Sequence, residues 1–240
     1  MDFKWIEEEN LVEQYNVYGS FYDIDLGSEI IQCRNDLHIY DKSSKKPFNR
    51  SNVPQLLMIM MNPGTSKPQN SNFLIPCYNS TDAGSFIRNT KLIKTVPDKT
   101  QYQVMRIMWN MGFEHTRVIN ISDLRNPESM KFSPELNRIH PLDSIHSLFS
   151  EKRIEELKEV LYNLDDQSVI FKAWGIGIVD NNKHFKGLAK KCLLSLPSNK
   201  KWLGLKGKTN LHYRHPLPFP SWSKKSQENW LKSVAPLFHT

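Results

Sequence analysis

An asparagine and a histidine far apart in the sequence each follow a stretch typical of a strand. Asn62 ends the apolar run 56–61, and His215 follows the strand-like stretch 209–213. A proline comes directly after each of them, which is typical of a turn or loop. Loops beyond the strand ends form the active sites of open α/β sheets. We therefore expect Asn62 and His215 to share one cleft, where an amide and an imidazole can both donate and accept hydrogen bonds.

Further motifs lie between these two residues. A helical stretch at 109–113 leads into an apolar segment that ends at Asn120, and the loop segment Arg125-Asn126-Pro127 follows. Another apolar stretch ends at Trp174. The order of these motifs along the chain favours a common site more strongly than any one of them does.

Strands and helices alternate around the motifs. This alternation predicts a single α/β domain with a central, mostly parallel sheet and helices on both faces. We assign residues 1–52 to an N-terminal helix and extended segments, and 53–240 to the core of that domain. The spacing of apolar residues predicts strands at 56–61, 117–121, 169–174 and 201–205, and helices at 5–16, 100–111, 151–164, 182–195 and 223–234, with extended segments at 18–40 and a long loop after Pro63.

Composition excludes several classes of protein. The three cysteines, Cys33, Cys77 and Cys192, are far apart and form no CxxC motif, so we expect neither a disulfide framework nor a metal cluster. The N-terminus lacks the order of a signal peptide, and no apolar run is as long as a membrane span. The expected protein is cytoplasmic, with no membrane partner.

Positive charge is concentrated near the C-terminus. From Lys183 onward there are twelve Lys or Arg residues and one acid, Glu228, a net charge of +11, whereas the rest of the chain carries −4. Such asymmetry indicates a polyanionic partner or, equally, a solvated Lys-rich surface. Because aromatic residues such as Trp222 and Trp230 are interleaved with the lysines, we favour nucleic acid, whose bases can stack on them.

Taken together, the motifs resemble those of the uracil-DNA glycosylase superfamily. Asn62-Pro63-Gly64 is similar to the Asn-Pro-Gly motif of the mismatch-specific uracil/thymine glycosylases, and Asn120 with the Arg125 loop resembles the next motif. His215-Pro216-Leu217-Pro218 resembles the His-Pro-Ser-Pro motif, and its start is also similar to the uncharacterised bacterial DUF1643 family. The resemblance covers about residues 30–220 and implies the glycosylase fold.

This resemblance implies roles for the two loop residues. A glycosylase acting on a duplex must flip the target nucleotide into a pocket. Asn62 would orient the attacking water through its amide oxygen, and His215 would donate a hydrogen bond to a carbonyl oxygen of the departing base. The alternatives are an asparagine that caps its own turn and a histidine packed between prolines.

The remaining assignments concern base and DNA contacts. Asn120 would read the base edge, beside Pro63 and Gly64, unless it only satisfies loop backbone. Phe73 or Tyr78 would stack on the base, with Phe86 as a rival and core packing as the alternative for each. Residues expected to contact DNA are Leu217 and Phe219 as apolar wedges, and Arg214, Lys206, Lys208, Lys224 and Lys225 as phosphate ligands.

We therefore predict a monomeric, cofactor-independent DNA glycosylase that removes a non-standard pyrimidine and acts in repair or against modified phage DNA. Two departures from the motifs, Leu217 in place of Ser and the long 65–100 loop, indicate that the base is not uracil. Two alternatives remain open: a non-catalytic nucleic-acid-binding protein of the same fold, and a hydrolase acting on small nucleotides.

Overall fold

Parallel strands form the centre of the fold. β3 (Leu56–Met60) is buried along its whole length and pairs with β7 (His115–Asn120) on one side and β8 (Val169–Ala173) on the other. β9 (Lys201–Leu203) extends β8. Strands covered on both faces read as continuous apolar runs, which is why the sequence predicts them well. The structure, a computed structural model, describes residues 3–81, 83–126 and 128–239.

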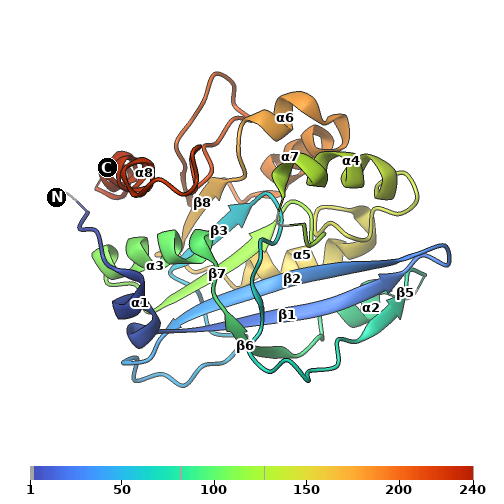
Figure 1. Ribbon diagram of the computed structural model, residues 1–240, viewed down its shortest axis with the longest axis horizontal. Helices are drawn as coiled ribbons and strands as arrows, with labels where there is room; N and C mark the ends of the chain where they lie inside the picture. Colours follow the sequence, from blue (N-terminus) through green and yellow to red (C-terminus); the bar gives the residue numbers. More distant parts are fainter. Residues whose placement is uncertain (1–2, 82, 127, 240) are drawn as a thin grey trace.

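An antiparallel half continues the same sheet. β1 (Tyr15–Asp25) and β2 (Ile30–Asp41) form a long hairpin, and β2 pairs with β7. Beyond β1 lie the short strands β6 (Leu92–Val96), β4 (Lys67–Pro68) and β5 (Cys77–Asn79). Within the described residues the strand order is β4-β6-β1-β2-β7-β3-β8-β9, with β5 paired to β1 (Figure 1).

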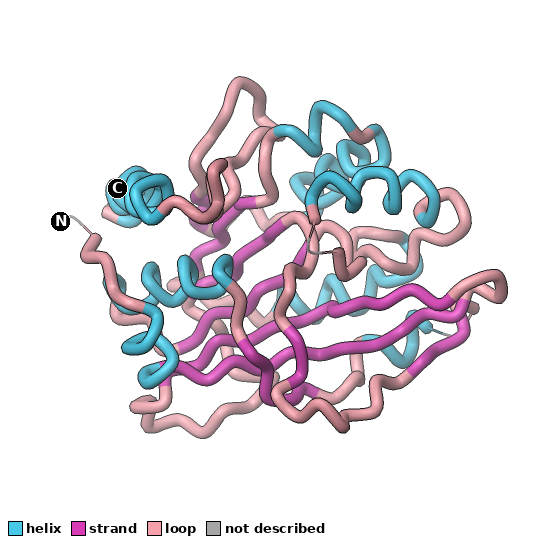
Figure 2. Tube along the Cα trace, in the orientation of Figure 1, coloured by secondary structure: helices cyan, strands magenta, loops and turns pink. Residues whose placement is uncertain are grey.

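Helices cover both faces of this sheet, as Figure 2 shows. One apolar layer lies under α2, α4, α5 and α7, and the other under α1, α3 and α8. The predicted α/β fold is thereby confirmed. The helices are α1 (Glu8–Gln14), α2 (Ala83–Ile87), α3 (Lys99–Met111), α4 (Ser129–Ile139), α5 (Ile154–Tyr162), α6 (Gly177–Asn181), α7 (Lys183–Ser195) and α8 (Lys224–Phe238), with a 3₁₀ turn at Glu151–Arg153 before α5.

Three local predictions are wrong. The stretch 209–213 is a turn with two isolated bridges at Tyr213, because His212 N–H donates to the Thr209 carbonyl and closes the chain on itself. The segment 65–100 is not a loop throughout, since it contains β4, β5, α2 and β6. The sequence predicts no helix at α4, which contains Pro134, a residue that disfavours helix interiors.

Within the described ranges no helix combines the length and the apolarity needed to cross a membrane.

Candidate active site

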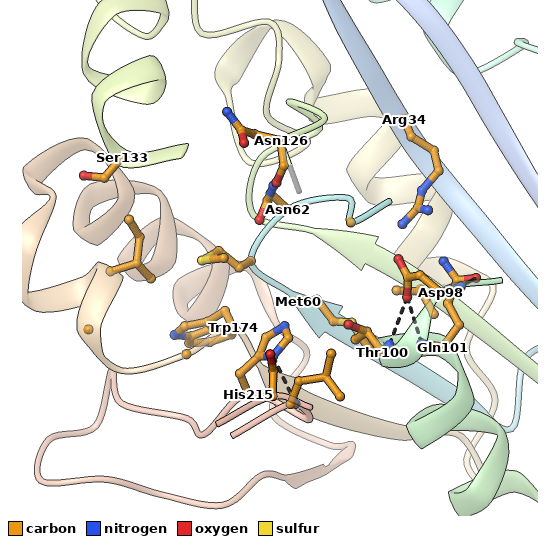
Figure 3. A pocket seen from close by; sticks show the side chains of 18 of the residues that line it. Arg34, Met60, Asn62, Asp98, Thr100, Gln101, Asn126, Ser133, Trp174 and His215 are labelled. Carbon is orange, nitrogen blue, oxygen red and sulfur yellow. Dashed lines mark hydrogen bonds between the residues drawn. The ribbon is translucent and has the colours of Figure 1, made fainter. Parts of the chain in front are cut away.

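A cavity of about 550 Å³ opens at the carboxyl ends of the parallel strands (Figure 3). Met60 ends β3 there, and Trp174 and Gly175 follow β8. The His215 loop and the N-terminal end of α3 complete its wall. The position agrees with the rule that open α/β sheets bind ligands beyond the strand ends. Its volume lies within the range of about 300–1,000 Å³ typical of small-molecule sites.

Asn62 lines the cavity with a fixed amide group. Its Nδ2 lies 2.8 Å from the carbonyl oxygen of Asn126, 3.2 Å from that of Leu124 and 3.1 Å from that of Pro63. Three acceptors around one NH₂ group settle which end of the amide is nitrogen. No described residue donates to Oδ1, so this oxygen remains available to a ligand or water in the cavity.

His215 lies across the same cavity and is held in one tautomer. The backbone N–H of Leu217 donates to Nδ1 at 3.1 Å, so the proton of the neutral ring is on Nε2. Burial lowers the pKa of His215 to about 4, while the charge of Asp98 acts in the opposite direction. At neutral pH His215 is therefore an uncharged hydrogen-bond donor.

The structure thus brings Asn62 and His215 into one cavity, as the sequence predicts. The turn-capping alternative for Asn62 is also partly correct, because its NH₂ group does bind its own loop. The same hydrogen bonds fix the orientation of the oxygen. An acceptor and a donor, each oriented by backbone groups, therefore face one space.

Asn120 lies at the end of β7 and is almost fully buried. It shares a face of the strand with Val118, which lines the cavity, but Asn120 itself is not among the described lining residues. Both polar atoms of its side chain lack a hydrogen-bond partner among the described residues. The predicted alternative, an asparagine that satisfies loop backbone, is therefore wrong in this structure.

The predicted stacking residues lie elsewhere. Neither Phe73 nor Tyr78 is among the described residues that line the cavity. The Tyr78 ring stacks on Phe86, with ring centres 5.7 Å apart, and its hydroxyl lies 3.2 Å from Thr90 Oγ1. Trp174 is the large aromatic side chain of the described lining, and its Nε1 donates to the Leu211 carbonyl at 2.8 Å.

The residues of the Asn-Pro-Gly segment do not all line the cavity. Gly64 lines the cavity, whereas Pro63 is buried and does not. In the second motif Asn126 lines the cavity, and Pro127 lies outside the described residues.

Of the predicted DNA contacts, one lines the cavity and the others are exposed on the surface. Leu217 lines the cavity and does not protrude as a wedge. Phe219, in contrast, is 88% exposed and packs edge-to-face on Trp222, which is 70% exposed. Lys224 donates to Glu7 at 2.6 Å, but both side chains remain exposed. The other predicted phosphate ligands, Arg214, Lys206, Lys208 and Lys225, are exposed near the same end of the chain.

Several polar residues of the cavity were not predicted, among them Arg34, Asp98 and Gln101. Arg34 comes from β2, and Asp98 and Gln101 form the capping box of α3. The capping-box spacing was readable in the sequence as a helix start. A single arginine within a strand gives no comparable signal.

Within the part of the chain that the structure describes, no group of three or more His, Cys, Asp or Glu side chains is arranged to hold a metal ion.

Comparison with known proteins identifies no relative of this chain. No family model matches the chain, and neither a curated protein nor a solved structure does.

Proposed function

We propose that the protein is a DNA glycosylase that hydrolyses the N-glycosidic bond of a flipped, non-standard pyrimidine. One observation carries the proposal: Asn62 Oδ1 and His215 Nε2–H are each oriented by backbone groups toward the same cavity. The pair suits a reaction in which water attacks the sugar while the base departs as an anion.

In this reaction positive charge develops on the sugar and negative charge on the base. Asn62 accepts a hydrogen bond from the attacking water and holds it in line with the bond that breaks. His215 donates from Nε2 to a carbonyl oxygen of the base, where the negative charge collects. Because an amide is too weak a base to remove a proton, stabilisation of the leaving group supplies most of the rate.

Two surface features support DNA as the substrate. Phe219 and Trp222 protrude beside the His215 loop, where they can replace a flipped base in the stack. Exposed Lys206, Lys208 and Arg214 flank the same segment and can bind phosphates. Their contribution would make affinity fall steeply with salt.

The test uses duplexes that each contain one modified pyrimidine. Wild-type protein should leave alkali-labile abasic sites in at least one duplex. Asn62→Ala should lower the single-turnover rate by about 10²–10³-fold and change duplex affinity little. Asn210→Ala, an exposed asparagine outside the cavity, is the matched control and should retain the rate.

Two outcomes would replace this proposal. Duplex binding without excision by folded wild-type protein would indicate a non-catalytic nucleic-acid-binding protein. Hydrolysis of free nucleotides with affinity insensitive to salt would indicate a small-nucleotide hydrolase.

A further inference from the structure

Arg34 presents a buried cation to the cavity. It is 3% exposed, and its Nε and Nη1 have no hydrogen-bond partner among the described residues. Figure 3 shows the guanidinium pointing from β2 toward Asp98 at one end of the cavity. Buried guanidinium groups are normally paired, so this arginine requires an explanation.

The carboxylates whose charge acts on Arg34 are engaged elsewhere. Asp36 binds Arg117 through both oxygens, at 2.9 Å each. Asp123 accepts from Tyr22 at 2.7 Å and from Arg153.

The third carboxylate, Asp98, caps α3. Its Oδ1 accepts from the backbone N–H groups of Thr100 and Gln101. Burial, together with the positive charge of Arg125, lowers the pKa of Arg34 to about 10, while the charge of Asp98 acts in the opposite direction. Arg34 therefore remains charged at neutral pH, and its side chain forms no ion pair with a described carboxylate.

A neighbouring amide adds a free donor. Gln101 lines the cavity, and its Nε2 has no described partner because Oε1 is the end that accepts from Asp98 N–H. The unpaired donors at this end of the cavity are therefore Nε and Nη1 of Arg34 and Nε2 of Gln101, which lack the hydrogen bonds they had in water. The oxygen of Asp98 that takes no part in the cap, Oδ2, is hydrogen-bonded to none of them.

We propose that Arg34 and Gln101 form an anion subsite that binds a carboxylate or phosphate group of the substrate. This inference deepens the proposed function: the glycosylase would select a base or nucleotide that carries such a group, and Asn62 and His215 would act on its glycosidic bond. A guanidinium donates to either group through two parallel hydrogen bonds, which amides alone cannot do.

Binding calorimetry on wild-type protein tests the subsite without any reaction. Uracil-5-carboxylate is compared with uracil, and 2′-deoxyuridine 5′-monophosphate with 2′-deoxyuridine. The anionic member of one pair should bind about 10- to 100-fold more tightly than its neutral partner. A gain in the first pair assigns the subsite to a carboxylate on the base, and a gain in the second to a nucleotide phosphate. Equal affinities within both pairs would overturn the inference.

Arg34→Met then identifies the residue responsible. It should remove the advantage of the anionic ligand, and Arg34→Lys, which keeps the charge but not the fork of donors, should retain part of it. Arg106→Met is the matched control, because Arg106 is also buried but lies over the Trp5 ring and donates to the Ile6 carbonyl outside the cavity. It should leave the ligand preference intact.

Stability separates a binding role from a structural one. Since Arg34 lacks partners, Arg34→Met should keep or raise the urea midpoint, whereas Arg106→Met should lower it. An anionic preference that persists in folded Arg34→Met would overturn the assignment. If both Arg34 variants fail to fold, Arg34 has a structural role and the inference fails.

The two proposals fail separately. Arg34-dependent anion binding without excision of any base would remove the glycosylase and keep the subsite. Excision of a base with no preference for the anionic ligand would remove the subsite and keep the glycosylase.

Discussion

Gly64 and Asp98 are in direct contact: a Cβ on Gly64 would lie 2.4 Å from Oδ2 of Asp98. Gly64→Ala should therefore displace the carboxylate that caps α3. Loss of such a cap typically costs about 1 kcal/mol, so the free energy of unfolding in urea should fall by about that amount. The excision rate should fall as well, because both residues line the cavity.

Gly187→Ala is a control that should change stability in the opposite direction. Gly187 is exposed within α7, and a Cβ there would meet nothing within 4 Å. Alanine should raise stability by about 0.5–1 kcal/mol and leave excision unchanged. Equal effects of the two substitutions would contradict the contact between Gly64 and Asp98.

The excision rate should be insensitive to pH across the range in which histidine ordinarily titrates. Because the pKa of His215 is lowered to about 4, the ring stays neutral well below pH 6.5. A histidine with the ordinary pKa would be only about one-tenth neutral at pH 5.5. Single-turnover rates measured against pH should therefore stay level to about pH 5, and His215→Ala should lower them about 10²–10³-fold. A tenfold decrease between pH 7.5 and 5.5 would count against this role.

Stability should fall on acidification before the carboxylates are neutralised. Burial lowers the pKa values of His115 and His146 to about 3, so below pH 6.5 the unfolded chain takes up protons that the folded protein does not. Asp123, whose pKa burial raises to about 6, acts in the opposite direction but over a smaller range. Unfolding free energies in urea should be highest above pH 6.5 and decrease toward pH 4. A level profile would show that these histidines are protonated in the folded state.

Phe219 and Trp222 should matter for duplex DNA and not for stability. Replacing both with serine removes an exposed aromatic pair, so the urea midpoint should stay constant. Duplex affinity should fall about tenfold or more, since a stacked aromatic contributes about 1–3 kcal/mol per base. Tyr162→Ser is the control, because Tyr162 is 85% exposed on α5. An equal loss in the control would rule out a specific wedge.

The sequence predicts the parallel half of the fold far better than the antiparallel half. β3 and β8 are apolar runs bounded by turns, and α3 begins with a capping box, all of which are local signals. The pairing of β6 with β1, in contrast, depends on contacts between distant segments. Such contacts leave no periodic pattern within 65–100, which therefore looks like a long loop.

In the site, too, the residues with local sequence signals are predicted and those that depend on tertiary contacts are not. Asn62 and His215 can be found because each stands directly before a proline, and Asn62 also follows the apolar strand β3. The stacking assignment for Tyr78 fails because its partner, Phe86, is brought to it by tertiary structure. Arg34 could not be predicted for a related reason. Its side chain lacks hydrogen-bond partners only because of how the chain folds, and no short stretch of sequence shows this.

The origin of Arg34 on the β1–β2 hairpin has an evolutionary consequence. Asn62 and His215 belong to loops of the parallel half, whereas Arg34 belongs to the hairpin, which pairs with that half through β7. Mutations in the hairpin can therefore change which molecules the cavity admits without moving Asn62 or His215. Such a division would let one scaffold acquire new selectivity by exchanging a single arginine.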